Sequence, residues 1–383
     1  MEITLQQKNI NSELQLIQGI IEKKTTSPIL GHVLMIAEGE NIKLLATDLE
    51  VWMKTTVPCR TSEGGSLLVP AKKLFEVVRA LPDLEITMKG QDNFWLNIKC
   101  ESSEFNLAGL PPEDFPSIPE IDFSSGYSIP QNELYDLIKR VVIAMTQEEG
   151  RFFINGALMQ KVADGLVMVA TDGHRLAYYK KKMELLEKKE EKKEDKKAEL
   201  KTVVAKKVLS ELLKIIDSKS TDPVIFDVKG NFIYFYIAPR LLVSRLLEAS
   251  FPNYKEAIEI DLDKKMVIPR QNFINAVRRV SLFANERVKG IMLKFSENSI
   301  DLASKSPELG NANEKISCQY KDETFKVGFN ADYLLDFLNV VDDEEVITEF
   351  RTVNKRAVFR QTKESEDEYR YVVMPMDVGE EEI

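Results

Sequence analysis

The sequence predicts an α+β protein built from three tandem copies of one domain, in which two helices pack on antiparallel sheets. Two observations support this prediction. A strand–turn–strand motif occurs three times, and each copy has similar segments before and after it. The clearest copy is Gly165–Tyr179, an apolar strand that turns at Asp172-Gly173 and resumes as a second strand.

The motif recurs at intervals as long as a domain. Leu44–Met53 repeats the Ala-Thr-Asp pattern 124 residues earlier, with Ala46 in the place of Ala170. A looser copy, Asp301–Ser306, lies 133 residues later, with Ala303 in that place. A period this long indicates one domain used three times.

A short strand and an amphipathic helix precede each motif. The helices are expected at Asn11–Ile21, Gln131–Met145 and Gln271–Phe283. The middle one has the clearest apolar stripe, formed by Leu134, Leu137, Ile138 and Val141, which leaves Asp136, Lys139 and Arg140 outside. Each repeat therefore begins with a strand and a helix, followed by two or three strands.

A second helix, then two or three more strands, follows each motif. The matching segments are Leu68–Arg79, Val203–Lys214 and Val327–Leu338. The step from motif to helix is 25 residues in the first repeat (Ala46 to Ala71), 35 in the second (Ala170 to Ala205) and 27 in the third (Ala303 to Asn330). The middle repeat therefore carries an insertion of about ten residues.

Proline-containing segments mark the repeat boundaries, because proline cannot donate a hydrogen bond to a sheet. Leu110–Pro119 and Ser250–Tyr254 are such segments. The predicted domains are residues 1–122, 123–260 and 261–383. The insertion lies at 180–201 and holds ten lysines and seven acidic residues, many with like charges at i, i+4. That spacing weakens an isolated helix, so we expect a solvated loop or frayed helical extension without a specific function.

The composition excludes several classes of function. No apolar run approaches the roughly 20 residues of a membrane span, and the N-terminus lacks an export signal, so we expect the cytoplasm. The three cysteines fall one per repeat without a Cys-x-x-Cys pair, and there are only two histidines. We therefore expect no metal, no cofactor and none of the common catalytic signatures.

Charge is distributed unevenly over the predicted helices. The net charge is −10, yet five of the six helices, or the turns after them, carry lysine or arginine on an exposed flank. The last helix is the exception, with Asp332, Asp336, Asp342 and Asp343. Stacked repeats would place the basic flanks on one shared surface, which could follow a phosphate backbone without reading bases.

The residues resemble those of one family, the bacterial sliding clamps, which are the beta subunits of DNA polymerase III. The resemblance covers the whole chain and is most specific at Ser27–Gly31, Ala46–Glu50, Val69–Lys73, Asn155-Gly156, Ala170–Ala177, Ser250–Tyr254, Asn285-Glu286 and Tyr371–Met376. It implies a head-to-tail homodimer whose six domains close into a ring around duplex DNA, with helices lining the hole.

The resemblance also implies a non-catalytic function. The ring would confer processivity by tethering its partners, which are the catalytic subunit of DNA polymerase III, the clamp loader and other proteins with short Leu-Phe-type motifs. The residues implied to face DNA are Lys24, Lys72, Lys73, Arg79, Lys139, Arg140, Lys206, Lys207, Arg278 and Arg279. Glu148 stands where the family often has a glutamine.

A pocket for partner peptides is implied as well. Its residues are Ile154, Thr171, Gly173, His174, Arg175, Leu176, Pro252, Val288, Asn330, Tyr333, Val372, Val373, Met374, Pro375 and Met376. Apolar side chains and adaptable methionines suit the burial of a partner's anchors. The chain departs from the family at Glu256 and Ala257, which would make the rim more acidic and shallower, and in its acidic tail 377–383. The implied dimer contact is Phe105 and Leu107 against Leu282 and Phe283, a cluster that could equally be internal packing.

Two other functions stay open at this stage. Asp172, His174 and Arg175 fall on one turn and could form an acid–base and anion-binding group of an enzyme, although no nucleophile or metal set accompanies them. A protein-binding scaffold that does not encircle DNA would explain the repeats but not the basic helix flanks.

Overall fold

The computed structural model describes residues 1–21, 27–117, 126–146, 155–188, 200–248, 250–258, 264–350, 356–363 and 365–378. The chain forms two compact units. The first consists of Met1–Tyr135, Leu185–Lys196 and Lys207–Leu246, and the second of Asp136–Glu184, Lys197–Lys206 and Leu247–Ile383. The middle repeat thus contributes to both units, so the units do not coincide with the repeats.

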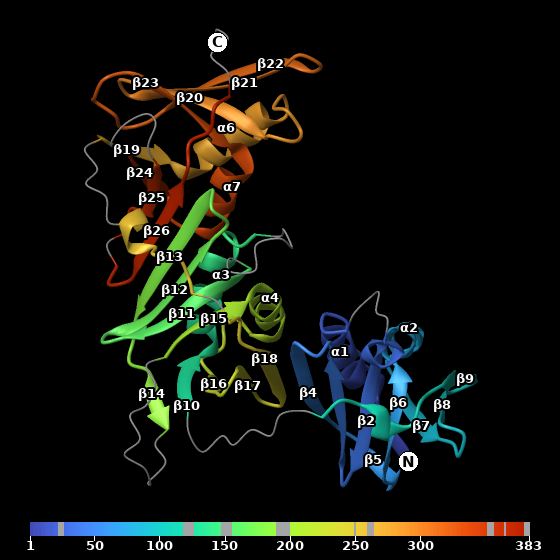
Figure 1. Cartoon of the computed structure of the whole chain (residues 1–383). Helices are drawn as coiled ribbons and strands as arrows, with labels where there is room; N and C mark the ends of the chain where they lie inside the picture. Colours follow the sequence, from blue (N-terminus) through green and yellow to red (C-terminus); the bar gives the residue numbers. More distant parts are fainter. Residues whose placement is uncertain are drawn as a thin grey trace. The chain divides into compact units, whose positions relative to one another are not determined.

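The first repeat contains two helices and nine strands within the described residues. They are β1 (Glu2–Gln6), α1 (Gln7–Ile17), β2 (His32–Glu38), β3 (Asn41–Thr47), β4 (Val51–Pro58), β5 (Arg60–Glu63), β6 (Gly65–Pro70), α2 (Ala71–Ala80), β7 (Glu85–Gly90), β8 (Trp95–Cys100) and β9 (Ser103–Ala108). Helices α1 and α2 pack side by side (Figure 1). Helix α1 begins four residues earlier than predicted, because Gln7 is buried and donates its side-chain amide to the carbonyl of Val78 on α2 (2.6 Å).

The second repeat follows the same order. Its elements are β10 (Gly126–Pro130), α3 (Gln131–Val142), β11 (Gly156–Val162), β12 (Gly165–Thr171), β13 (Arg175–Lys182), β14 (Leu186–Lys188), β15 (Lys201–Ala205), α4 (Lys206–Ile215), β16 (Pro223–Lys229), β17 (Phe232–Ile237), β18 (Arg240–Arg245) and the single turn α5 (Lys255–Ile258). The predicted strand–turn–strand motif is confirmed as β12 and β13, which pair antiparallel.

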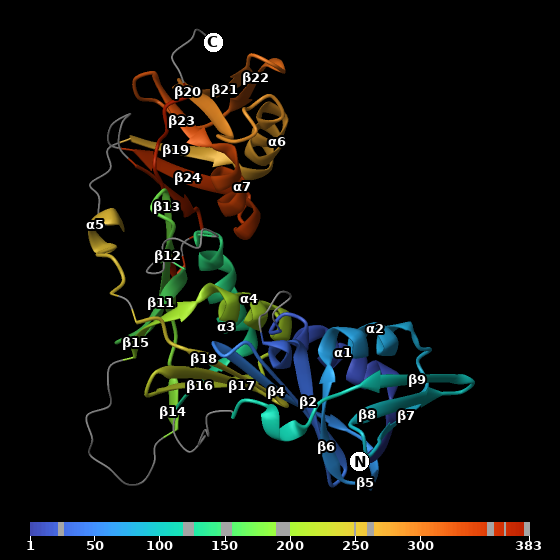
Figure 2. The same cartoon turned by 45° about the vertical axis from the view of Figure 1, so that its right-hand side comes forward.

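The third repeat consists of β19 (Lys264–Pro269), α6 (Arg270–Ser281), β20 (Gly290–Ser296), β21 (Ser299–Ser306), β22 (Gly310–Ser317), β23 (Phe325–Asn330), α7 (Ala331–Val340), β24 (Glu345–Phe350), β25 (Ala357–Gln361) and β26 (Glu368–Val373). Helix α6 packs on α7 and on β21 and β22 (Figure 2). The core of this repeat is aromatic. Phe325 stacks on Phe295 and meets Phe350 edge-on, and Phe337 stacks on Tyr371.

Some predicted details are confirmed and others are wrong. The second helices start at Ala71, Lys206 and Ala331, within one residue of the positions used to count the steps, and the first residues of each matching segment complete a strand. Four or five described strands, rather than two or three, separate the helices of each repeat. Asp342 and Asp343 lie beyond the end of α7, and Asp343 is buried, where it accepts hydrogen bonds from Gln361 and the Lys363 backbone.

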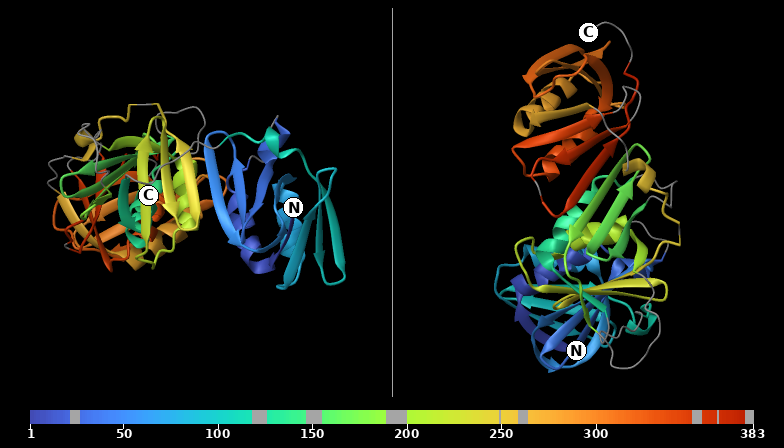
Figure 3. Two further views of the ribbon diagram at one scale, coloured as in Figure 1. Left: turned by 90° about the horizontal axis from the view of Figure 1, so that it is seen from below. Right: turned by 90° about the vertical axis from the view of Figure 1, so that its left-hand side faces the viewer.

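The first unit contains a five-stranded sheet, β5-β1-β7-β8-β9, and a nine-stranded sheet, β14-β10-β16-β17-β18-β4-β3-β2-β6. The larger sheet crosses from the first repeat to the second where β4 pairs antiparallel with β18. The blue strands of the first repeat accordingly lie beside the yellow strands of the second (Figure 3, left). Backbone hydrogen bonds therefore join these two repeats into one structure.

The second unit contains an eight-stranded sheet, β15-β11-β12-β13-β26-β25-β24-β19, and a four-stranded sheet, β22-β21-β20-β23. Here β13 of the second repeat pairs antiparallel with β26 of the third. Strands β4 and β13 occupy equivalent places, directly after the Ala-Thr-Asp turn, and β18 and β26 are the last strands of their repeats. Both junctions thus follow one rule: the strand after the turn pairs with the last strand of the next repeat.

The insertion differs from the expected solvated loop. Its first residues continue β13, where Lys181 pairs with Asp367 (3.0 Å) and Lys182 with Glu366 (2.9 Å). Residues Leu186–Lys188 then form β14, which pairs with β10 at the edge of the nine-stranded sheet. Residues 189–199 lie outside the described residues.

Two further predictions concern the state of the cysteines and the absence of membrane-spanning segments. Cys59, Cys100 and Cys318 are free and buried, and burial raises the pKa of the Cys318 thiol to about 11. No helix among the described residues is long and apolar enough to span a membrane.

A buried ion pair supplements the first sheet junction. Arg240, the first residue of β18, donates to both carboxylate oxygens of Glu13 on α1 (2.6 and 2.9 Å). Thr55 on β4 donates to the same carboxylate (2.8 Å). The Glu13 side chain is only 7% exposed, so the arginine and the hydroxyl replace the water that this charge loses on folding.

We predict that Glu13→Gln destabilises the first unit by about 3 kcal/mol, because it leaves the Arg240 guanidinium without its counter-charge. Urea unfolding followed by tryptophan fluorescence measures this change. Trp52 on β4, one of only two tryptophans, is directly opposite Val243 on β18 and therefore reports on this junction.

The matched control is Glu85→Gln, which removes the partner of Arg60 in a pair where one guanidinium nitrogen donates to both carboxylate oxygens (2.9 and 3.0 Å). Both side chains of that pair are exposed, so its loss should cost less than about 1 kcal/mol. Equal effects of the two substitutions would contradict a role for Glu13 at the junction.

Candidate functional site

The turn between β12 and β13 is held by its own side chains. Asp172 accepts hydrogen bonds from the backbone N–H groups of His174 (3.0 Å) and Arg175 (2.9 Å). Thr171 Oγ1 donates to the Arg175 carbonyl (2.7 Å) and accepts from the Gly173 N–H (3.1 Å). Gly173 has φ +87°, a conformation that glycine adopts without strain. The turn is therefore rigid and projects the Arg175 side chain in a fixed direction.

Arg175 links this turn to the third repeat. Its guanidinium contacts Asp172 (3.1 Å) and Asp336 on α7 (2.5 Å), donates to the Tyr371 hydroxyl (3.1 Å) and lies 4.2 Å from the centre of the Tyr333 ring. Burial by itself lowers the pKa of Arg175, but the Tyr371 oxygen and the Asp336 carboxylate together raise it. The arginine is thus permanently charged and 11% exposed.

The end of β26 brings the predicted Met-Pro-Met segment beside the same turn. The Met374 N–H donates to the His174 carbonyl (2.8 Å), and the Met376 N–H donates to the Gly328 carbonyl on β23 (2.9 Å). The amide of Asn330 donates to the Val288 carbonyl (3.3 Å) and so connects the loop before β20 to the start of α7. Residues from four separate segments of the second unit therefore meet here.

Leu176 and Val372 form the apolar floor next to these groups. They belong to one buried cluster with Leu158, Val167, Val169, Tyr178, Ile258 and Val358. The proline-containing linker packs against that cluster through Phe251 and Tyr254, and Ala257 after it does the same. Val373 is completely buried, so it supports the site from behind and does not face a partner. The side chains open to solvent are those of His174, Pro252, Val288 and Met374.

Most of the predicted pocket residues thus gather in one unit. The contacts above join Thr171–Leu176, Asn330, Tyr333 and Val372–Met376. Pro252 lies in the proline-containing linker that packs on the apolar cluster. Ile154 and Glu148 are outside the described residues. Glu256 is exposed and accepts a hydrogen bond from the Asn253 amide (2.9 Å), and Ala257 is part of the packed cluster.

Asp336 is the residue that the sequence analysis missed as part of this site. It was noted only as one acid of the last helix, yet it is the partner of Arg175. Its position three residues after Tyr333, on the same face of α7, is the signal that could have identified it.

The geometry argues against the acid–base alternative. The Asp172 carboxylate is occupied by two backbone N–H groups and by Arg175. The Arg175 charge is in turn neutralised by Asp172 and Asp336. No group of three or more metal-binding side chains occurs among the described residues. The charged side chains of this turn are therefore engaged in structural contacts and are not available for acid–base catalysis.

The predicted DNA-facing residues divide into two groups. Lys72, Lys73 and Arg79 on α2 and Arg278 and Arg279 on α6 are exposed, as expected. Lys73 pairs with Glu76 (2.6 Å), and Arg279 pairs with Glu314 (2.5 Å), so part of this charge is neutralised locally. Lys139 on α3 is half-buried, and Lys24 lies outside the described residues.

Arg140 is not an exposed cation, and this prediction is wrong. Its side chain pairs with Asp136 (2.9 Å) and lies against the rings of Tyr179 (4.9 Å) and Tyr369 (5.3 Å). It also donates to Gln361 on β25 (3.3 Å). The side chain is only 10% exposed, because α3 packs it against strands of the third repeat. Arg140 therefore holds two repeats together.

Lys206 and Lys207 are also engaged rather than free. Lys206 donates to the carbonyls of Met145 (3.1 Å) and Thr146 (3.3 Å), and burial lowers its pKa. Lys207 donates to the Ile20 carbonyl (2.8 Å) and pairs with Asp48, the aspartate of the first Ala-Thr-Asp motif (2.5 Å). Both are half-buried, so the expectation of a solvated basic flank is wrong for them.

The two halves of the predicted dimer contact lie in different units. Phe105 and Leu107 are on β9, where Phe105 is exposed and Leu107 is buried. Leu282 and Phe283 follow α6, and Leu282 is 72% exposed, more than any other large apolar side chain among the described residues. Phe283 lies near Gly310, the first residue of β22.

Three family models match the chain in order. They describe the N-terminal domain of the DNA polymerase III beta subunit (residues 1–119), its central domain (128–253) and its C-terminal domain (255–377). The beta sliding clamp of Pseudomonas aeruginosa is 31% identical over 378 residues, which cover 98% of this chain and 100% of that protein. The beta sliding clamp of Escherichia coli is 27% identical over the same shares of the two chains.

Solved structures agree with the family models. The crystal structure of the DNA polymerase III subunit beta from Pseudomonas aeruginosa has a TM-score of 0.87 at 31% identity and covers 98% of this chain and 100% of that one. A sliding clamp from Bartonella birtlesii, solved with griselimycin bound, has a TM-score of 0.89 at 28% identity and covers 99% and 100%. The chain belongs to the family of DNA polymerase III beta subunits, the bacterial beta sliding clamps.

Proposed function

We propose that two copies of this chain join head to tail into a six-domain ring that encircles duplex DNA and tethers the replicative polymerase. The relatives are named beta sliding clamps, and the ring would pair two of the edge strands of the chain, β9 and β22. The function is processivity without catalysis, carried out in the cytoplasm. We propose that the three domains of each chain span residues 1–122, 123–260 and 261–383, so that a dimer has six domains.

The observation that carries the proposal is the junction rule. Each junction within the chain pairs the strand after the Ala-Thr-Asp turn with the last strand of the next repeat. Applied to the third repeat, the rule requires β22 to pair with the last strand of a first repeat, β9. Both β22 and β9 are edge strands of their sheets. Each chain thus offers one edge of each kind, which is the requirement for a heterologous contact that closes into a ring.

Side chains near these edges fit such a contact. Phe105 on β9 is exposed, and Leu282 and Phe283 stand beside β22. Leu309, directly before β22, is 51% exposed. We propose that these apolar groups meet across the dimer interface, where burial of about 25 cal/mol per Å² would add to the backbone hydrogen bonds.

DNA would be retained by enclosure and weak attraction. The exposed cations Lys72, Lys73, Arg79, Arg278 and Arg279 support a contact with phosphates, and Lys24 and Lys139 complete the proposed set. Lys206 and Lys207 would contribute long-range charge only, since their ammonium groups have partners in the protein. The net charge of −10 would keep the attraction small, as sliding requires.

We propose that the site around Arg175 receives the short Leu-Phe-type motifs of partners such as the polymerase catalytic subunit and the clamp loader. Leu176 and Val372 offer an apolar floor, while Met374 and Met376 are adaptable walls. A clamp from C. crescentus was solved with PEG bound to its beta-motif tethering region, which supports a comparable region here. A protein-binding scaffold without DNA would use the same pocket but would leave β9 and β22 unpaired.

We predict that Phe105→Asp combined with Leu282→Asp converts the dimer to a monomer of 43.7 kDa and abolishes retention on DNA. An aspartate at each side of the interface opposes dimer formation, because its carboxylate must be desolvated when the two copies meet. Light scattering measures the mass. Gel filtration on nicked circular duplex, loaded with the clamp loader, measures retention, and linearising the circle should release the unmodified ring.

The matched control is Leu186→Asp, which alters another exposed leucine, 65% exposed on β14, away from both edges. It should leave mass and retention unchanged. A double variant that stays dimeric and remains on circles would overturn the ring assignment.

A second prediction concerns the partner site. Met374→Ala, at a side chain that is 47% exposed, should weaken binding of a fluorescent peptide ending in Leu-Phe by about tenfold, the loss expected at an interface hot spot. Leu176→Ala is less informative, because Leu176 is core and its truncation also destabilises the fold.

Fluorescence anisotropy measures the affinity, and circular dichroism checks that the variant is folded. Leu84→Ala, which truncates a leucine of the first repeat that is 41% exposed, is the control and should bind normally. Unchanged affinity in Met374→Ala would remove Met374 from the site.

A further inference from the structure

The methionine sulfur atoms of this chain differ widely in their access to solvent. The structure describes every methionine of the sequence. Of these, only Met374 is exposed, with 47% of its surface open, while Met183, Met292 and Met376 are half-buried. The buried methionines are Met1, Met35, Met53, Met88, Met145, Met159, Met168 and Met266. The most accessible thioether therefore lies at the candidate site around Arg175.

The cysteines do not compete with this thioether for an oxidant. All three are free and buried. Peroxides attack the thiolate form of cysteine, and burial raises the pKa of Cys100 and, to about 11, that of Cys318. Cys59 is only 9% exposed, and its sulfur lies 3.5 Å from the Thr61 hydroxyl oxygen. We therefore expect the most reactive sulfur of the chain to belong to a methionine.

The backbone holds Met374 in its exposed position. Its N–H donates to the His174 carbonyl (2.8 Å). The preceding residue, Val373, is completely buried and pairs with Arg175 across the sheet. Two residues later, the Met376 N–H donates to the backbone of β23 (2.9 Å). Because the segment is anchored on both sides, the Met374 side chain cannot turn into the core, and its thioether stays at the surface.

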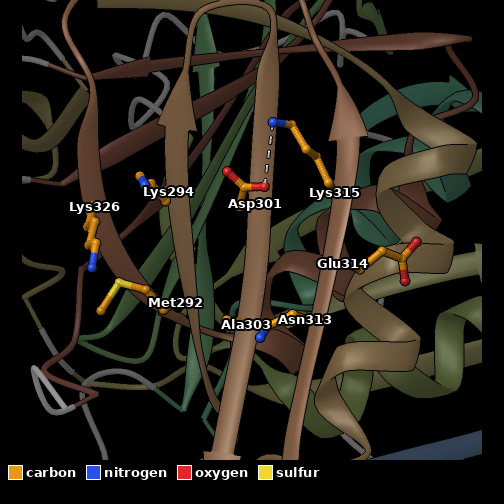
Figure 4. A pocket seen from close by; sticks show the side chains of 8 residues that line it. All are labelled: Met292, Lys294, Asp301, Ala303, Asn313, Glu314, Lys315 and Lys326. Carbon is orange, nitrogen blue, oxygen red and sulfur yellow. Dashed lines mark ion pairs between the residues drawn. The ribbon is translucent and has the colours of Figure 1, made fainter. Parts of the chain in front are cut away.

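Met376 and Met292 belong to the same unit but are better covered. The Met376 sulfur lies 3.6 Å from the position that a Cβ atom on Gly290 would take, so this side chain packs on β20. Met292 lies on the face of the four-stranded sheet opposite the buried Leu293, which we call the outer face. There it lines a hollow of about 360 Å³ beside Lys326 (Figure 4). Both residues therefore serve as internal comparisons for Met374.

We propose that Met374 is the site at which a peroxide modifies this chain, and that its sulfoxide form has a lower affinity for Leu-Phe-type peptides. The second half rests on the proposed function, because it requires the peptide to contact Met374. In the reaction, the sulfur lone pair bonds to one peroxide oxygen as the O–O bond breaks. The proton of that oxygen passes to the departing hydroxide, so the sulfur loses two electrons and hydrogen peroxide becomes water.

The sulfoxide changes an apolar contact into a polar one. Its S=O group must lose water when a peptide settles on the apolar floor of the site. The Arg175 guanidinium cannot readily compensate, because it already contacts Asp172, Asp336 and the Tyr371 hydroxyl. We expect a loss of affinity of about tenfold, which corresponds to about 1.4 kcal/mol. Sulfoxide reductases reverse the modification, so it would act as a switch.

The first test treats the purified full chain with hydrogen peroxide and follows each methionine by peptide mass spectrometry. Fragment spectra separate Met374 from Met376. Since oxidation follows exposure, Met374 should react about threefold faster than Met376 and about tenfold faster than the buried Met168. A rate at Met374 no higher than that at Met376 would overturn the modification site.

The second test measures peptide affinity at the same peroxide doses, by fluorescence anisotropy with the peptide ending in Leu-Phe. The affinity of the unaltered chain should fall about tenfold and return after treatment with the two methionine sulfoxide reductases, one for each epimer. Met374→Leu, whatever its starting affinity, should not respond to peroxide. Met292→Leu, the matched control on the outer face, should respond as the unaltered chain does.

Three results would contradict the effect on affinity. One is a peroxide-dependent loss of affinity in Met374→Leu. Another is unchanged affinity in the unaltered chain after Met374 has been oxidised. A chain that binds no peptide before treatment would contradict the proposed function together with this effect, whereas the mass spectra would still decide whether Met374 is the modified residue.

Discussion

The structure depends on one interaction, the antiparallel pairing of the strand after each Ala-Thr-Asp turn with the last strand of the next repeat. At β4–β18 and β13–β26 this pairing joins two half-sheets into one. Backbone hydrogen bonds need no particular side chain, so three diverged repeats can keep the same junction. The consequence is that the compact units straddle the repeats, and that β9 and β22 remain as edges.

Buried charges orient the elements around these junctions. Glu13 with Arg240 acts at the first, and Arg175 with Asp172 and Asp336 acts at the second. Each group has several hydrogen-bond partners, because a charge removed from water is tolerated only when its partners replace that water. Fixed partners also fix the direction of the charged side chain. The contacts of Arg175 therefore hold the turn, α7 and β26 together at one site.

The segment from Tyr371 to Val378 connects three features of the second unit. Tyr371 bonds to Arg175 and to the Tyr333 carbonyl, Met374 is attached to the turn at His174, and Val378 packs over Gly290 and Gly328. One continuous segment of chain therefore links the proposed partner site to the outer face of the four-stranded sheet.

The sequence by itself determined the repeat architecture and the strand–turn–strand motif, because hydrophobic periodicity and turn chemistry are local. The segments of the candidate site were identified through the resemblance to the sliding-clamp family. The sequence could not determine which charged residues are exposed. Arg140, Lys206 and Lys207 have the same helical spacing as free surface cations, and only the tertiary structure supplied Gln361, the Met145 carbonyl and Asp48 as their partners. The unpaired edges β9 and β22 were likewise invisible in the sequence, since an edge is defined by the strand that is absent beside it, and that depends on the tertiary structure.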